Sequence, residues 1–243
     1  MGILWINIII AILLAILLGN GSVVLVNKMP QKWFEDSKIE NGEEIKYIPE
    51  KLLEADHAGR QRLTSTPWKY IFVSMLMVMG IYLSVTSSIK YEIPAIIILF
   101  IMLEIAICDQ LYRVVPNQLF LLMALSATGF IGYNEKWWEP LAGAGIGLAL
   151  GLAELGIGLL IYKKVAIGGA DIKFFACMGL IAGRRGILVI FVLTTFLFAI
   201  ESIYMVAVKK ASIKEGLALM PSAFVATTIY LLFLYNILDI IEL

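Results

Sequence analysis

The chain has 243 residues, of which 60% are hydrophobic and 16% are charged, and its mean hydropathy is +0.90. This composition excludes an ordinary soluble enzyme, because several apolar runs approach or exceed the roughly 20 residues that cross a bilayer. The 19 basic and 19 acidic residues cancel to a formal net charge of zero, which gives no sign of a nucleic-acid partner, and we expect none.

The first apolar run covers residues 3–26 and is predicted to be a retained membrane span. It is long for a signal-peptide core, no Lys or Arg precedes it, and it lacks an obvious small-residue cleavage site. A polar segment at 27–69 follows, with eight basic residues, eight acidic residues and the chain's only histidine, His57. We expect a small cytoplasmic loop here, because the segment is too short to bury a core of its own.

The rest of the chain alternates apolar runs with short polar connections. With the first span it predicts an all-α fold, a polytopic membrane helix bundle of about eight transmembrane spans with a small cytoplasmic loop. Cysteine occurs only at Cys108 and Cys177, so neither a disulfide framework nor a cysteine zinc site is indicated. The seven later spans are expected at 68–85, 93–108, 115–131, 141–162, about 172–182, 187–208 and 217–238.

The distribution of basic residues orients this bundle. If the amino terminus lies outside, fifteen Lys and Arg fall on the cytoplasmic side and only four outside, a strong positive-inside bias. We therefore expect a multi-pass protein of the inner or cytoplasmic membrane. The fifteen are Lys28, Lys32, Lys38, Lys46, Lys51, Arg60, Arg62, Lys69, Arg113, Lys163, Lys164, Lys173, Lys209, Lys210 and Lys214, and the four are Lys90, Lys136, Arg184 and Arg185.

Small residues recur at every fourth position of the fifth predicted span. Gly143, Gly147 and Gly151 form a stripe that would allow a close helix–helix contact in lipid. Glu154 continues this face, so we expect its carboxyl to point into the bundle and to accept a hydrogen bond from a neighbouring helix. Glu104 and Glu201 are similar acidic residues inside apolar runs.

An acidic residue marks the predicted end of the third span. Asp109 ends the apolar run, and Arg113 follows one helical turn later, where it could pair with Asp109 or mark the inner boundary. Pro116 and Asn117 then open the next span. An ionisable group at a membrane boundary is a functional hypothesis by default.

A second acidic residue, Asp171, follows a flexible glycine pair in the stretch GGADIK at 168–173. We expect Lys173 first to anchor the inner boundary and second to support a site. An aspartyl protease needs at least two carboxyls, here expected at one membrane face. One carboxyl takes a proton from water, and the other polarises the peptide carbonyl. That chemistry needs no metal or cofactor, and we expect none.

These two stretches resemble the catalytic motifs of the type IV prepilin peptidases, the GxGD-type aspartyl proteases of bacteria and archaea. The resemblance implies that Asp109 and Asp171 are the catalytic pair. Ala170 stands at the third position of the motif, where the family's hydrophobic variant allows a residue other than glycine. The resemblance gives a supporting role to Arg113, Pro116, Asn117, Gly168, Gly169, Ala170 and Lys173.

The resemblance covers most of the chain. Residues 19–30, which end in NKMP, are similar to the family's amino-terminal glycine-rich run, and residues 219–221 (LMP) are similar to its proline-containing last span. The segment 27–69 departs from the family pattern, because it has no cysteine where the larger bacterial members carry a zinc-binding cysteine cluster. This departure puts the family's second activity, N-methylation of the mature pilin, in doubt.

The resemblance implies a membrane endopeptidase that cleaves the leader of type IV prepilins or pilin-like proteins, for pilus assembly or protein secretion. Cleavage would occur at the cytoplasmic boundary of the substrate's apolar helix, and the partners would be that helix and membrane lipid. The chain would then divide into a first span at 1–26, a cytoplasmic loop at 27–69 and a membrane-embedded peptidase domain at 70–243.

Other readings remain open at this point. A proton- or ion-coupled transporter subunit could use Glu104, Glu154 and Glu201 as a relay, although the sequence contains no internal repeat. A catalytically silent assembly subunit would make both aspartates replaceable. The presenilin-like proteases also use GxGD, but Asp109 follows a cysteine rather than a tyrosine and no Pro-Ala-Leu motif occurs near the end of the chain.

The predicted helix ends suggest which carboxyl is ionised. The third span would end at Asp109, beside the partial negative charge of a helix carboxyl end, whereas the sixth would begin at Asp171, beside a partial positive charge. We therefore expect Asp171 to be the base at rest and Asp109 the acid. A pairing of Arg113 with Asp109 would oppose this bias.

Overall fold

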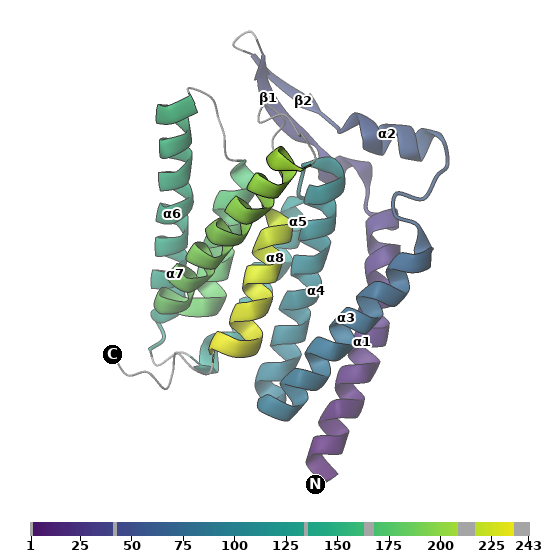
Figure 1. The fold of residues 1–243 in the computed structure, drawn as a ribbon, viewed down its shortest axis with the longest axis vertical. Coiled ribbons are helices and arrows are strands. Elements are labelled where there is room, and N and C mark those ends of the chain that lie inside the picture. The colour runs from purple at the N-terminus through teal and green to yellow at the C-terminus, as the bar shows by residue number, and fades with distance from the viewer. Residues whose placement is uncertain (1, 41–42, 134–135, 163–167, 209–216, 236–243) are drawn as a thin grey trace.

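The computed structural model describes residues 2–40, 43–133, 136–162, 168–208 and 217–235 as a helix bundle with a small hairpin at one end (Figure 1). The long helices follow the apolar runs, because a helix satisfies its own backbone hydrogen bonds where lipid offers none. In chain order the elements are α1 (Gly2–Lys28), η1 (Gln31–Phe34), β1 (Asp36–Glu40), β2 (Glu43–Tyr47), α2 (Glu50–His57), α3 (Ser65–Thr86), α4 (Ile89–Tyr112), α5 (Asn117–Ser126), η2 (Ala127–Tyr133), α6 (Glu139–Tyr162), α7 (Gly169–Ala207), α8 (Met220–Ile229) and η3 (Tyr230–Leu234).

Five of these helices are long and apolar enough to cross a membrane, namely α1, α3, α4, α6 and α7. The helix α5 has ten residues and continues as the 3-10 helix η2, and α8 with the π-helical turn η3 forms a shorter apolar helix. Each predicted span therefore corresponds to a helical segment, but the segments predicted at 115–131 and 217–238 are shorter than full spans. The predicted all-α membrane bundle is confirmed.

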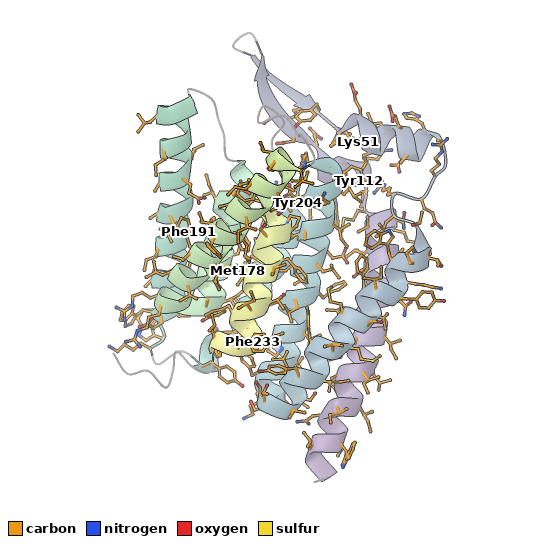
Figure 2. All side chains as sticks on the ribbon, viewed as in Figure 1. Lys51, Tyr112, Met178, Phe191, Tyr204 and Phe233 are labelled. Atoms are coloured by element: carbon orange, nitrogen blue, oxygen red, sulfur yellow. The ribbon has the colours of Figure 1, made fainter. Side chains whose placement is uncertain are left out.

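The helix α7 turns back on itself. The rings of Phe175 and Phe191 lie 5.2 Å apart between centroids, although residues this far apart on a straight helix would be separated by about 24 Å. The break lies at Gly183, whose φ of 66° and ψ of −171° suit a residue without a side chain. The two antiparallel halves of α7 correspond to the predicted sixth and seventh spans, and Figure 2 labels Met178 and Phe191 on them.

Small residues bring α6 and α7 into backbone contact. A Cβ atom at Gly143 would collide with the backbone of Gly179, and one at Gly147 would collide with the backbone carbonyl of Phe175. A Cβ atom at Gly151 would also press on the backbone of α7, one turn closer to the start of that helix. The close contact predicted from the glycine stripe is confirmed, and it fixes the first half of α7 against α6.

The helix α4 is the centre of the bundle. It contacts α1, α3, α5 and α8, and 72% of its apolar window is buried. At its first turn, the buried Tyr91 donates a hydrogen bond from its hydroxyl to the carbonyl of Leu231 over 2.9 Å. Because α4 is held along its length, its last turn, which carries Asp109, has a fixed position in the fold.

The polar segment forms more structure than the predicted loop. The strands β1 and β2 form an antiparallel hairpin, and Phe34 and Leu52 are fully buried. The guanidinium of Arg62 donates to both carboxylate oxygens of Asp56, over 2.9 and 2.6 Å, and to the Met29 carbonyl at the end of α1. The bond from Arg62 to Met29 spans 33 positions of sequence, and the hydropathy pattern did not predict it.

The ends of the bundle differ in their polar residues. At the end where α1 begins, Arg184 forms an ion pair with Glu139 over 3.2 Å and lies over the ring of Trp138. The hairpin and α2 lie at the opposite end (Figure 1). The end of the last predicted span, near Leu238, lies outside the described residues. So do five of the basic residues used to orient the bundle, namely Lys163, Lys164, Lys209, Lys210 and Lys214.

Candidate active site

The predicted catalytic residues lie where three helix ends meet. Asp109 is in the last turn of α4, Asp171 is in the first turn of α7, and α8 begins nearby at Met220. Figure 2 labels Tyr112 of α4 and Tyr204 of α7 in this upper part of the bundle, and Phe233 near the lower end of the last helix. The site therefore lies at the same end of the bundle as the hairpin and α2.

The sequence after Asp109 ends α4 and turns the chain. Arg113 caps the helix with a left-handed backbone (φ 59°), and its N–H donates to the carbonyl of Asp109 over 3.0 Å. The buried Pro116 then caps α5. The side chain of Arg113 is exposed and forms no ion pair with Asp109 within the described residues, so the pairing considered from the sequence is not observed.

The Asp109 carboxylate is held by the start of α8. The backbone N–H of Met220 donates to its Oδ2 over 3.0 Å. The unpaired N–H groups at a helix amino end favour a negative charge. The start of α8 therefore opposes the bias that the end of α4 exerts on Asp109, and the assignment of Asp171 as the base and Asp109 as the acid stays a prediction.

Asp171 closes the first turn of its own helix. Its Oδ2 accepts a hydrogen bond from the N–H of Gly168 over 3.1 Å, and its own N–H donates to the Gly168 carbonyl over 3.1 Å. Only the Asp171 half of a capping box is present, because Gly168 has no side chain, and the bond from the Gly168 N–H fixes the carboxylate relative to α7.

The glycine pair leaves the approach to Asp171 open. Both Gly168 and Gly169 are exposed, and no atom lies within 4 Å of the position that a Cβ of Gly169 would take. Gly168 has φ −73° and ψ 150°, which other residues also adopt. The backbone conformation of Gly168 therefore does not require a glycine. The lack of side chains at the pair keeps space free beside the Asp171 carboxylate.

The two motif stretches are joined directly by their side chains. The Lys173 ammonium, on α7, donates a hydrogen bond to the Asn117 side-chain carbonyl, at the start of α5, over 2.7 Å. Ala170 is half-buried and packs against the core. The expected supporting role of Lys173 thus has a definite partner, which the separate motifs did not identify.

The two candidate carboxylates lie within electrostatic range of each other. Two further acids are nearby, with Glu201 close enough to act on Asp109 and Glu154 close enough to act on Asp171. Like charges that approach in this way favour a pair in which one carboxyl holds a proton. Among the described residues, no group of three or more His, Cys, Asp or Glu could hold a metal ion.

The three glutamates named for a possible relay have different contacts. Glu154 accepts from the hydroxyl of Thr195 over 3.5 Å, a contact with a neighbouring helix of the kind expected. Glu201 accepts from the hydroxyl of Ser222 over 2.6 Å. Glu104 is fully buried and faces Ser22, but within the described residues neither of its oxygens accepts a well-formed hydrogen bond.

Two parts of the site were not assigned from the sequence. The amide of Met220 is a backbone group, and the Glu201 side chain was treated as a relay candidate instead of a neighbour of Asp109. The sequence did contain a signal for the helix start at Met220, because Pro221 falls within the first turn of α8 and proline is favoured at a helix start. The sequence does not reveal that this helix start faces Asp109.

Comparison with known proteins agrees with the predicted family. Residues 96–203, which include Asp109 and Asp171, match the type IV leader peptidase family. A prepilin leader peptidase/N-methyltransferase of Bacillus subtilis (strain 168) is 26% identical to this chain over 145 residues. The alignment covers 59% of this chain and 56% of the relative, so the chain spans little more than half of that protein's length.

No solved structure matches the chain. The resemblance to the type IV prepilin peptidases is confirmed by the family match and by the relative. These findings favour the peptidase family over a transporter subunit.

Proposed function

We propose that this protein is a membrane aspartyl endopeptidase that removes the leader of type IV prepilins or pilin-like proteins. The observation that supports the proposal most is the meeting of Asp109 and Asp171, from two separate motifs, at one end of the bundle and within electrostatic range. Each carboxylate accepts a backbone N–H at a helix amino end, over 3.0 and 3.1 Å. Such fixed donors hold catalytic groups in place before the substrate arrives.

The proposed reaction is peptide hydrolysis by a pair of carboxyls. The ionised aspartate takes a proton from a water molecule, whose oxygen attacks the scissile carbonyl carbon, and the protonated aspartate donates its proton to the carbonyl oxygen. Collapse of the tetrahedral intermediate breaks the C–N bond, and the leaving amine takes the proton that the base had accepted. The other aspartate takes a hydroxyl proton from the intermediate as the product carbonyl forms, so the pair returns to its starting protonation state.

The location of the site suits an apolar substrate helix. The carboxylates lie at the end of α4, which is long enough to cross a membrane, and at the start of α7, so a substrate helix lying beside them would present its end to the site. The polar segment with its basic residues lies at this same end, and the positive-inside bias places it in the cytoplasm. We therefore assign cleavage to the cytoplasmic boundary, with residues 70–243 as the peptidase unit and 1–26 and 27–69 as its first span and cytoplasmic segment.

Substitution of each aspartate tests this proposal. Asp109→Asn and Asp171→Asn keep side-chain size and remove the ability to exchange a proton, so each should reduce cleavage of a prepilin-type substrate by about 100-fold to 10,000-fold. Asp36→Asn, at an exposed position of β1, is the matched control and should cleave like the wild type. Size-exclusion profiles in detergent report whether each variant is folded, and near-normal cleavage by a folded Asp109 or Asp171 variant would contradict the proposal.

A further inference from the structure

The polar segment packs against the helix turn that carries Asp109. Tyr112 is the last residue of α4 and lies three positions after Asp109, so the two are neighbours on the helix surface. The ring of Tyr112, which Figure 2 labels at this end of the bundle, meets the ring of Phe34 edge to face. The ring centroids are 5.3 Å apart and the planes lie at 73°. Because Phe34 belongs to η1, this contact joins the polar segment directly to the end of α4.

Both rings are buried. Phe34 has no exposed surface, and Tyr112 is 8% exposed. An edge-to-face geometry at this separation is one of the arrangements that aromatic rings prefer. The contact is therefore part of the packed interior, rather than an approach of two surface side chains.

Arg62 holds the Phe34 ring in place. Its guanidinium carbon lies 5.7 Å from the ring centroid, within the range of a cation–π contact. The Arg62 side chain is only 5% exposed and forms an ion pair with Asp56. The same guanidinium donates to the backbone carbonyls of Val26 and Met29 at the end of α1. Phe34 therefore packs on a side chain that is itself fixed.

The end of α1 anchors this arrangement. The Asn27 side chain donates to the carbonyl of Leu63 over 2.8 Å and accepts from the N–H of Leu63 over 3.1 Å. Asn27 belongs to the stretch NKMP at 27–30, which resembles the end of the family's amino-terminal run. The helix α1 in turn packs against α3 and α4. A series of contacts therefore runs from the end of a membrane-spanning helix to the turn of Asp109.

The last turn of a helix is the part that needs such contacts most. Helix ends fray, and Asp109 lies only four residues before the cap at Arg113. The start of α8 holds the Asp109 carboxylate through the N–H of Met220, over 3.0 Å. The contact on Tyr112 acts on the same turn from the polar segment. Asp109 is thus held at its carboxylate by one element and through its helix turn by another.

We propose that the polar segment positions Asp109 for the reaction: Phe34, held by Arg62, packs against Tyr112 and thereby fixes the last turn of α4. The inference rests on the proposed peptidase function. It makes Phe34, Arg62 and Tyr112 positioning residues, because they act on Asp109 through the helix turn. It also gives the segment 27–69, which lies outside both catalytic motifs, a direct effect on the rate.

Substitutions on either side of the contact test its effect on the rate. With full-length protein in nanodiscs and a prepilin-type substrate, Phe34→Leu and Tyr112→Leu should each lower kcat about tenfold and leave KM within about twofold. The reason is that a small displacement of a reacting group slows the reaction more than it weakens binding. Tyr112→Phe keeps the ring and should restore most of the rate that Tyr112→Leu loses. The double variant Phe34→Leu/Tyr112→Leu should be no slower than either single variant, since both changes remove one contact.

A matched control separates positioning from a general loss of stability. Phe72→Leu removes a ring that is 5% exposed and that stacks on Trp68 within α3, with centroids 5.7 Å apart. It should keep the wild-type kcat. A rise in KM with an unchanged kcat in Phe34→Leu would overturn the inference, as would an equal loss of kcat in Phe72→Leu.

Hydrogen exchange separates failure of this inference from failure of the proposed function, because it needs no cleavage. The amides of residues 109–113 should exchange about twofold to tenfold faster in Phe34→Leu than in the wild type, the range expected for the loss of one aromatic pair. In Phe72→Leu they should exchange at the wild-type rate.

Unchanged exchange of this turn in Phe34→Leu or in Tyr112→Leu, whichever size-exclusion profiles show to be folded, would overturn the inference whether or not the wild type cleaves. Faster exchange with an unchanged kcat would also overturn it, because the contact would then be structural only. Faster exchange without any cleavage by the wild type would instead support the hold on the Asp109 turn and contradict the peptidase.

Discussion

The Lys173 ammonium donates a hydrogen bond to the Asn117 side-chain carbonyl over 2.7 Å, across 56 positions of sequence. Lys173 lies two residues after Asp171, and Asn117 begins the helix that follows the Asp109 turn. The bond therefore ties together the two short segments that hold the candidate carboxylates. Both side chains are exposed, so the hydrogen bond adds little to overall stability. We expect it to act instead on the position of the two carboxylates.

We expect Lys173→Met and Asn117→Ala each to lower kcat about tenfold with little change in KM, because a small displacement of reacting groups costs much of the rate. The double variant should lose no more than either single variant, since both remove the same bond. Lys32→Met, at an exposed position of η1, is the control and should not change the rate. Losses that multiply in the double variant would show that the two residues act separately.

The sequence predicted those parts of the molecule that depend on local pattern. The apolar runs predicted the helices, the glycine spacing predicted the α6/α7 contact, and the two motifs predicted Asp109 and Asp171 as candidates. The contacts that assemble the site are long-range, such as the bond from Met220 to Asp109 across 111 positions. Hydropathy and spacing carry no information on such contacts, because they describe each segment alone.

The lack of information on long-range contacts also explains where the predictions from the sequence differ from the structure. The helix carboxyl end at Asp109 was correctly placed, but its charge environment also includes the start of α8, which only the tertiary structure reveals. The predicted spans at about 172–182 and 187–208 correctly placed the break between them, and the structure adds that Gly183 makes the α7 turn with a left-handed backbone. The strands β1 and β2 pair with each other and follow no apolar pattern that the sequence analysis could use.

The contact between α6 and α7 gives a second prediction. Gly147→Ala would place a Cβ against the carbonyl of Phe175, and the two helices would have to separate, at a cost of about 1–3 kcal/mol. Gly145→Ala, two residues away on the same helix, meets no atom within 4 Å and should leave stability unchanged. Thermal unfolding in detergent compares the two. An equal melting temperature for both variants would mean that the interface adjusts without cost.

The polar segment depends on one ion pair that is largely buried. The side chains of Arg62 and Asp56 are 5% and 22% exposed and lie 2.6 Å apart. The hydrogen bond from Arg62 lowers the pKa of Asp56 below its ordinary value. A carboxyl with a lowered pKa stabilises the folded state fully above its unfolded-state pKa of about 3.9, and this contribution is lost as the pH falls through the folded-state pKa.

A third prediction follows for the docking of residues 29–63. Hydrogen-exchange protection of this segment, corrected for the intrinsic rates, should stay constant from pH 7 to about pH 5 and fall below about pH 4. Asp56→Asn should lower the protection near neutral pH toward the level that the wild type reaches in acid, and should remove this acid-induced loss. Glu35→Gln, which breaks an ion pair of the exposed Lys46, is the control and should have little effect. A loss of protection in the Asp56→Asn protein with the original pH midpoint would assign the acid sensitivity to another group.

The last prediction concerns methyl transfer, because the name of the Bacillus subtilis relative includes an N-methyltransferase. Segment 27–69 contains no cysteine and so cannot form a thiolate zinc site of the kind that the larger family members carry there. In its place, Arg62 joins Asp56 to the end of α1 through its hydrogen bonds, which hold the segment without metal. We expect the purified protein to cleave a prepilin-type substrate in the presence of S-adenosylmethionine and EDTA, and to leave the new amino terminus unmethylated. Mass spectrometry of the mature substrate decides the matter, since a product heavier by one methylene group, made by this protein alone, would show that methyl transfer in this chain does not depend on a cysteine zinc site.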